Sequence, residues 1–235
     1  MNSTKKTARI AGFIYLLLAI TGVVSLLYFP RTFFVFGNAT ATANNITSSE
    51  LLFRIAIFTS LISQVIFVFL VLALYRLLKE ISHMQALLMV TLVVVSASTG
   101  FLNTLNQVAA LILLSGADFL SVFEKPQLDA LAYVFLRLHS QGWQAIQIFW
   151  GLWLFPFGFL VYKSRFIPRI LGVLLTIAGS AYLLSSFMFF VLPQYKTTVS
   201  PLITLLEMGE LPIILWLLIM GAKAQSLENP APSAL

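Results

Sequence analysis

Six apolar runs, each long enough to cross a bilayer, constrain this chain more than any other feature of its sequence. A hydrocarbon core of about 30 Å needs about 20 apolar residues in a helix, which satisfies its own backbone groups in lipid. The composition agrees, because 60% of the residues are hydrophobic, 9% are charged and the mean hydropathy is +0.97. We therefore predict an all-α integral membrane protein, a bundle of six transmembrane helices.

The predicted spans form a single transmembrane domain over residues 1–223, and residues 224–235 are predicted to be a disordered cytoplasmic tail. The spans are expected at about 10–29, 51–78, 84–114, 128–162, 167–192 and 200–223. The fourth run would make a helix of roughly 50 Å, so it either projects beyond the bilayer or breaks near Gly142. Residues 30–49 are expected to be a polar outside loop, and residues 116–127 could form a short outside helix before the fourth span.

The basic residues indicate the orientation of the six spans. Nine Lys and Arg residues fall on the side that carries both termini, and Arg31, Lys125 and Lys196 fall on the other. The positive-inside rule therefore predicts a multi-pass protein of the cell membrane with both termini in the cytoplasm. Arg54 and Arg137 lie within hydrophobic segments, where an isolated charge is unfavourable.

The last span carries two carboxylates, Glu207 and Glu210, whose i,i+3 spacing places them on one helix face. Polar residues also recur at helical spacing in the outer halves of the third and fourth spans, where lipid offers them no partners. We expect them to line an outward-facing polar pocket between spans two, three, four and six, with Glu210 as principal charge and Arg54 as its neutraliser. The candidate pocket residues are Glu210, Glu207, Arg54, Asn103, Asn106, Gln107, Arg137, His139, Gln144 and Gln147.

Structural roles remain open for the same residues. Polar side chains at helix contacts often serve packing, and Arg54 with either glutamate could be a structural ion pair. Arg137 could extend to the headgroups, and His139 could be an interfacial side chain. Kinks are expected at Pro156 and Pro212, since each removes a backbone hydrogen bond. The four Trp residues are interpreted as core or lipid-facing side chains.

The sequence gives little support to enzymatic chemistry. It contains no Cys, and its two histidines, His83 and His139, fall on opposite sides of the membrane, so we expect no metal site, no cofactor and no catalytic residues. Hydrolase, P-loop and zinc-protease motifs are absent. The basic residues form no stripe on a soluble face, so nucleic acid is not an expected partner.

Three segments of the sequence form recognisable motifs. They are Ala8–Tyr15 (ARIAGFIY), 151–158 followed by Ser164–Leu175 (SRFIPRILGVLL), and Gly209-Glu210 followed by Leu215–Gly221 (LWLLIMG). In these segments the chain resembles the bacterial domain-of-unknown-function 4386 family of polytopic membrane proteins, and the resemblance covers about residues 8–223. It implies a membrane protein of six or seven helices with no established activity, and Glu210 matches the last motif.

Three hypotheses for function follow. The first is binding, sensing or transport of a small polar or amphipathic ligand in the outward-facing pocket. The second is a membrane-embedded enzyme acting on a lipid headgroup, with Glu210 or His139 as acid-base group. The third is a structural or accessory membrane subunit with a buried ion pair. The expected partners are the lipid bilayer and a small-molecule or lipid ligand, and the oligomeric state is left open.

Overall fold

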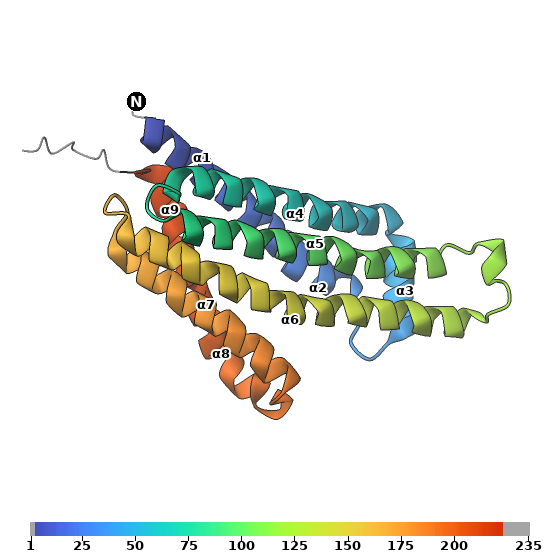
Figure 1. The fold of residues 1–235 in the computed structure, drawn as a ribbon. Coiled ribbons are helices and arrows are strands. Elements are labelled where there is room, and N and C mark those ends of the chain that lie inside the picture. Colours follow the sequence, from blue (N-terminus) through green and yellow to red (C-terminus); the bar gives the residue numbers. More distant parts are fainter. Residues whose placement is uncertain (1–2, 223–235) are drawn as a thin grey trace, which may run out of the picture.

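The computed structural model describes residues 3–222, and within them all regular elements are helices (Figure 1). In chain order they are α1 (Ser3–Val23), η1 (Val24–Tyr28), α2 (Phe29–Phe33), α3 (Ala39–Ser48), α4 (Glu50–Leu78), α5 (His83–Leu113), η2 (Asp118–Leu120), α6 (Lys125–Lys163), α7 (Arg169–Phe190), η3 (Pro193–Tyr195), α8 (Lys196–Glu207), η4 (Met208–Glu210) and α9 (Leu211–Ile219). The tail predicted at 224–235 lies outside the described residues.

The described residues contain six helical stretches long and apolar enough to cross a membrane, which confirms the predicted all-α, six-span architecture. They are Thr4–Phe33, Glu50–Leu78, His83–Leu113, Lys125–Lys163, Arg169–Phe190 and Thr197–Ile219. The first stretch includes the π-helix η1, in which each turn is wider than in an α-helix. The last changes to a 3-10 turn, η4, which ends two residues before Pro212 and supports the kink expected there.

The polar segment between the first and second spans is a helix, where the sequence predicted a loop. Asn38 caps α3 by accepting a hydrogen bond from the backbone N–H of Ala41 at 2.9 Å. The helix buries Thr42, Ala43 and Ile46 at helical spacing and packs against α6. By contrast, the short helix expected before the fourth span is only the 3-10 turn η2.

The fourth span is one continuous helix, α6, of 39 residues, or about 58 Å. Its start is fixed by a capping box between Glu124 and Gln127. It runs unbroken through Gly142 and Pro156, so the alternative of a break near Gly142 is excluded. Of the two alternatives drawn from its length, projection beyond the bilayer agrees with the structure.

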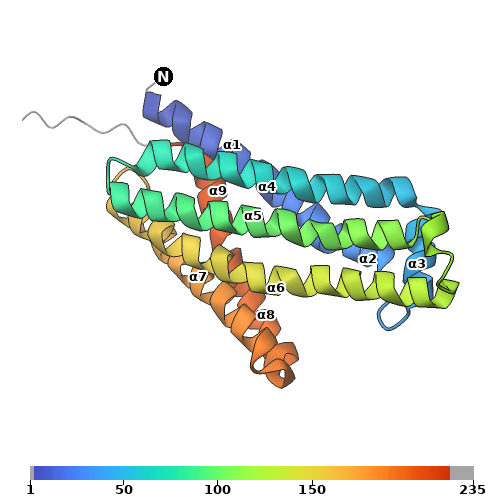
Figure 2. The ribbon, with the colours of Figure 1, turned by 45° about the vertical axis from the view of Figure 1, so that its right-hand side comes forward.

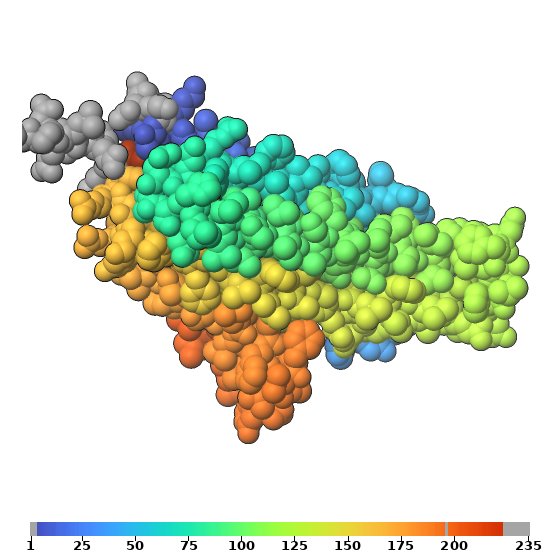
Figure 3. All heavy atoms as spheres, in the orientation of Figure 1, coloured from blue at the N-terminus to red at the C-terminus, as the bar shows by residue number. Residues whose placement is uncertain are grey.

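The six spans come together at one end of the molecule, and towards the other end α4, α5 and α6 stay side by side while the pair of α7 and α8 leans away. We call the first the basic end, because it carries the start of α1 and the α4–α5 and α6–α7 turns with Arg76, Lys79, Lys163 and Arg165. The opposite end, the α3 end, carries α3 and the α5–α6 connection. Figures 1 and 2 show that α7 and α8 lean away from α6 with increasing distance from the basic end. In Figure 3 the tip of this helical pair protrudes from the body of the molecule.

A close approach at two glycines and a hydrogen bond between the first and last spans stabilise the basic end. Gly158 and Gly172 allow the backbones of α6 and α7 to meet, since a Cβ built on Gly158 would lie 2.7 Å from the carbonyl oxygen of Gly172. Arg9 on α1 donates a hydrogen bond to the carbonyl oxygen of Ile219 at 2.8 Å, at the end of α9. The first and last spans are therefore joined at this end.

Candidate ligand-binding cavity

A cavity of about 690 Å³ lies between α7 and α8 on one side and α1, η1 and α6 on the other. The predicted pocket was lined by spans two, three, four and six, and each of these contributes side chains. The prediction was wrong in leaving out the other two spans. Residues 22–34 from the first span form much of one wall, and Tyr182 from α7 closes another.

Five buried oxygen atoms of residues that line this cavity have no hydrogen-bond partner within the described part of the chain. They are Ser25 Oγ and the Oε1 atoms of Gln107, Gln144, Gln147 and Glu207. Buried polar groups in proteins are almost always paired, because an unpaired one costs about 1 to 3 kcal/mol. Unpaired acceptors gathered around one cavity are explained by a partner that the chain does not itself supply, such as water, an ion or a polar ligand.

Glu207 and Glu210 lie on either side of the break between α8 and α9. Glu207 is the last residue of α8, and Glu210 ends the 3-10 turn η4. Glu210 Oε2 accepts a hydrogen bond from the hydroxyl of Tyr15 on α1 at 2.5 Å. Tyr182 and Ser185 on α7 are close enough to interact with Glu210 and Glu207, respectively, as hydrogen-bond donors. The two carboxylates therefore differ, since Glu210 is held by tyrosines while one oxygen of Glu207 is unpaired.

A second cavity of about 430 Å³ adjoins the first, and Glu207 lines both. Glu210 and Tyr15 line only the second, whose wall includes Leu18, Phe67 and Ile214. Both carboxylates thus reach this space, and its wall contains no Lys or Arg.

Aromatic rings form a continuous wall along the cavities. The centroid of Trp143 lies 5.8 Å from that of His139 and 5.4 Å from that of Trp150, which lies 6.1 Å from Tyr182. The α6 residues in this series recur at helical spacing, so they share one face. The tryptophans were interpreted from sequence as core or lipid-facing side chains, whereas Trp143 and Trp150 line both cavities.

His139 is held in a hydrogen-bond network rather than exposed at the membrane interface. Trp143 Nε1 donates to His139 Nε2 at 3.1 Å, and His139 Nδ1 lies 3.0 Å from the carbonyl oxygen of Asn103. An indole can only donate and a carbonyl can only accept, so the imidazole is neutral with its proton on Nδ1. Asn103 returns a hydrogen bond to the His139 carbonyl at 2.9 Å. Both ring nitrogens of His139 are therefore occupied.

Three of the predicted pocket residues line neither cavity. Asn103 is buried in the contact with α6, and Asn106 donates back to Asn103. Arg54 was expected to neutralise Glu210, and this was wrong: its Nε bonds to Glu50 Oε1 at 2.7 Å, and 57% of its side chain is exposed. The i,i+4 spacing of Glu50 and Arg54 offers a nearer partner on the same helix.

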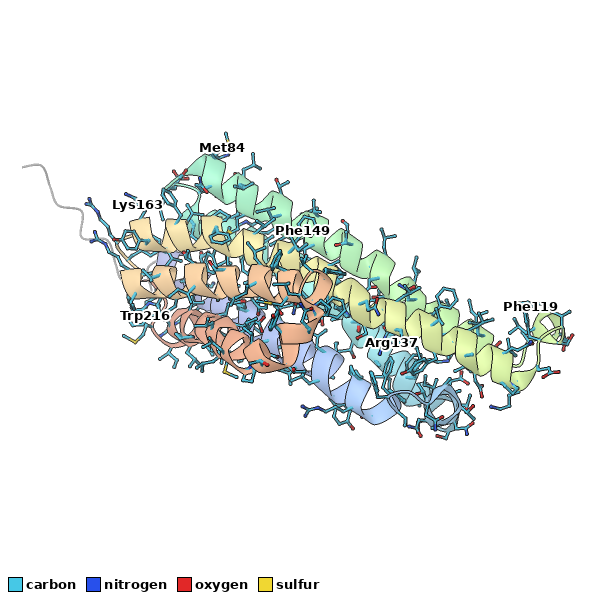
Figure 4. All side chains as sticks on the ribbon, turned by 90° about the horizontal axis from the view of Figure 1, so that it is seen from below. Met84, Phe119, Arg137, Phe149, Lys163 and Trp216 are labelled. Atoms are coloured by element: carbon cyan, nitrogen blue, oxygen red, sulfur yellow. The ribbon has the colours of Figure 1, made fainter. Side chains whose placement is uncertain are left out.

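Arg137 lies on the part of α6 beyond the tip of α7 and α8, as Figure 4 shows between the ends marked by Lys163 and Phe119. It lines the larger cavity, and its guanidinium is 5.3 Å from the ring centroid of Phe36. Among the residues that line this cavity, Arg137 and Glu207 are the charged ones. Arg137 therefore places a positive charge towards the α3 end, and Glu207 a negative charge deeper in the bundle.

Several cavity residues were not predicted as pocket residues, notably Tyr15, Ser25 and Tyr182. Tyr15 and Glu210 are 195 positions apart, and no local pattern links them. Ser25 belongs to the π-helix, and its buried Oγ has no partner within residues 3–222. Within residues 3–222, no group of three or more His, Asp or Glu residues lies close enough together to hold a metal ion.

The fold and the cavity define a multi-pass, all-α membrane protein with two carboxylates in its interior. The chain belongs to the family described as "Domain of unknown function (DUF4386)", whose model matches residues 10–221. This confirms the family indicated by the sequence motifs.

One similar protein comes from Archaeoglobus fulgidus and is described as an uncharacterized protein. It is 34% identical to this chain over 82 residues, which cover 35% of this chain and 48% of the relative. The matched region thus spans about half the length of that relative. No solved structure matches the chain.

Proposed function

We propose that this protein binds a small organic cation that donates hydrogen bonds, such as a primary amine, in the cavity beside Glu207. The observation that carries the proposal is the buried, unpaired Oε1 of Glu207, together with three unpaired glutamine oxygens in the same cavity. An ionised carboxylate can only accept hydrogen bonds, whereas an amide can turn to accept or donate. The carboxylate of Glu207 therefore favours a ligand with a positive charge.

The aromatic wall of the cavity also favours a positively charged ligand. The rings of Trp143, Trp150 and Tyr182 line the cavity, and aromatic faces attract ammonium groups. We assign the principal charge to Glu207 rather than to Glu210, which the sequence favoured. Tyr15 already donates to Glu210, so its position is partly structural.

The orientation of the molecule belongs to the same proposal. The basic end carries the cationic turns, so the positive-inside rule places it and both termini in the cytoplasm. The larger cavity includes Phe34, Phe36 and Arg137 towards the α3 end, so in this orientation it lies in the outer part of the molecule.

The test is thermal unfolding of the purified protein with butylamine, butanol and butyrate. Only butylamine is expected to raise the unfolding temperature of the wild type. The Glu207→Gln variant is expected to lose roughly tenfold or more in affinity, because a hydrogen bond to a charged group contributes about 1.5 to 3 kcal/mol.

Glu50→Gln is the matched control, since Glu50 lies outside both cavities and 49% of its side chain is exposed. It is expected to keep the butylamine response of the wild type. Equal responses to butylamine in the wild type and in Glu207→Gln would contradict the proposal, as would equal responses of the wild type to butylamine and butanol.

A further inference from the structure

The two cavities adjoin and share part of their lining, and their walls differ in chemistry. Ser25, Trp150 and Glu207 line both parts. The larger part contains the unpaired glutamines, and the smaller is walled mainly by apolar side chains such as Leu18 and Phe67. A ligand that fills both therefore needs a polar group and an apolar group, with the polar group near Glu207, where the parts meet.

The smaller cavity reaches the surface between two helices that face lipid. Val23 and Leu27 on one side and Met208 and Leu211 on the other line this cavity, yet between 49% and 57% of each residue is exposed. We call these four residues the lateral rim. A cavity whose lining is half exposed on two facing elements opens between them.

The lateral rim lies within the hydrocarbon layer. Val23 is 14 residues above Arg9, or about 21 Å, and Met208 is 11 residues above Ile219, or about 17 Å. Both distances are shorter than the hydrocarbon thickness of about 30 Å. Acyl chains, not water, therefore lie outside this opening.

The first and last spans pack together through α1 and α9, but they separate where α8 begins to follow α7. α8 packs against α7, and within residues 3–222 no contact of similar extent joins α8 to α1 or η1. The π-helix η1 forms the edge of the opening, and π-helical turns frequently mark functional sites. The separation at the rim is thus part of the arrangement of the helices.

We propose that the ligand is an amphiphile with an ammonium group on a single alkyl chain, and that it enters sideways from the membrane through the lateral rim. This inference rests on the proposed function and names the class of its ligand. Charge complementarity fixes the head, because Glu207 and Glu210 line the smaller cavity without a Lys or Arg. Gln107 is 8% exposed with an unpaired Oε1 in the larger part, which gives the head a second polar contact. The apolar wall receives the chain.

The test uses the protein in lipid nanodiscs with a dodecylamine that carries a photoreactive diazirine at the end of its chain. Covalent labelling is expected in two peptides, around residues 20–28 and 204–214, that border the rim. An excess of plain dodecylamine should suppress this labelling, whereas dodecanoate, with the opposite charge, should not. Labelling in Glu207→Gln is expected to fall about tenfold or more.

Met208→Trp fills the rim and is expected to reduce labelling of both peptides, while butylamine still stabilises the variant. Leu215→Trp is its matched control, since Leu215 is 54% exposed on α9 and lies outside both cavities. It should label as the wild type does. If butylamine binds but dodecylamine labels all lipid-facing helices equally, the lateral entry is wrong and the amine site stands. If neither amine binds, both proposals fail.

Discussion

At the scale of single residues, the interior contains side chains whose hydrogen bonds are all made and side chains that have a buried polar atom without a hydrogen-bond partner. His139 and Trp143 satisfy each other in the contact between α5 and α6. The Nε1 atom of Trp216 on α9, in contrast, is buried without a partner in the described structure. Removing these two indole donors should therefore have different effects.

We expect Trp143→Phe to lower the free energy of unfolding by about 1 to 3 kcal/mol, because it leaves His139 Nε2 buried and unpaired. Trp216→Phe makes the same chemical change at a donor that has no bond to lose, and it should leave stability nearly unchanged. Equilibrium unfolding in mixed micelles, followed by circular dichroism, measures both. Equal losses in the two variants would mean that the network contributes no stability.

Residue positions along a helix were largely predictable, and residue partners across helices were not. The phase of Gln144 and Gln147 on α6 follows from their spacing, and both line the cavity. The partner of Glu210 is Tyr15, and only the packing of α1 against α9 brings these two spans together. The partner of Arg54 was accessible from sequence, since Glu50 precedes it by one helical turn.

At the scale of elements, glycines decide which helices approach closely. The carbonyl oxygen of Gly172 lies where a side chain on Gly158 would begin, whereas a Cβ on Gly22 would meet no atom within 4 Å. Both glycines lie in helices, so replacing each by alanine changes helix propensity alike. A difference in stability between the two variants then reports on packing.

Gly158→Ala is expected to lower the free energy of unfolding by about 1 to 3 kcal/mol, because α6 and α7 must move apart. Gly22→Ala should be neutral or stabilise by up to about 1 kcal/mol, because alanine is the better helix former and space is available. Thermal unfolding of the ligand-free variants is the measurement. If Gly158→Ala is as stable as Gly22→Ala, the two helices can yield at this contact.

The composition of α3 explains why this helix was not predicted from the sequence. The six spans follow from their apolar runs, but α3 is rich in Asn, Thr and Ala and carries little hydrophobic signal. Its small apolar face, Ala43 and Ile46, predicts a helix only if α6 is known to extend far enough to cover that face. The length of α6 was visible in the sequence, but its contact with α3 depends on the arrangement of the whole bundle.

At the scale of the whole molecule, the orientation in the membrane can be tested simply, because the chain contains no cysteine. Ser121→Cys places a thiol at the α3 end, and Glu80→Cys places one in the α4–α5 turn at the basic end. Both positions are exposed. In intact cells a membrane-impermeant maleimide should label Ser121→Cys, whereas Glu80→Cys should react only after lysis. The opposite pattern would reverse the proposed orientation.

The length of the central helices means that one chain is stabilised in two different solvents. At the α3 end Phe53, Ile46 and Leu136 belong to a buried cluster separate from the main core. Phe53 stands about 35 Å above Arg76 and Leu136 about 40 Å above Lys163, beyond a hydrocarbon layer of about 30 Å. Water drives the burial of this cluster, whereas helices within lipid associate through packing and polar contacts. Cooling weakens hydrophobic burial, so the α3 end should loosen before the part of the bundle that lies in lipid.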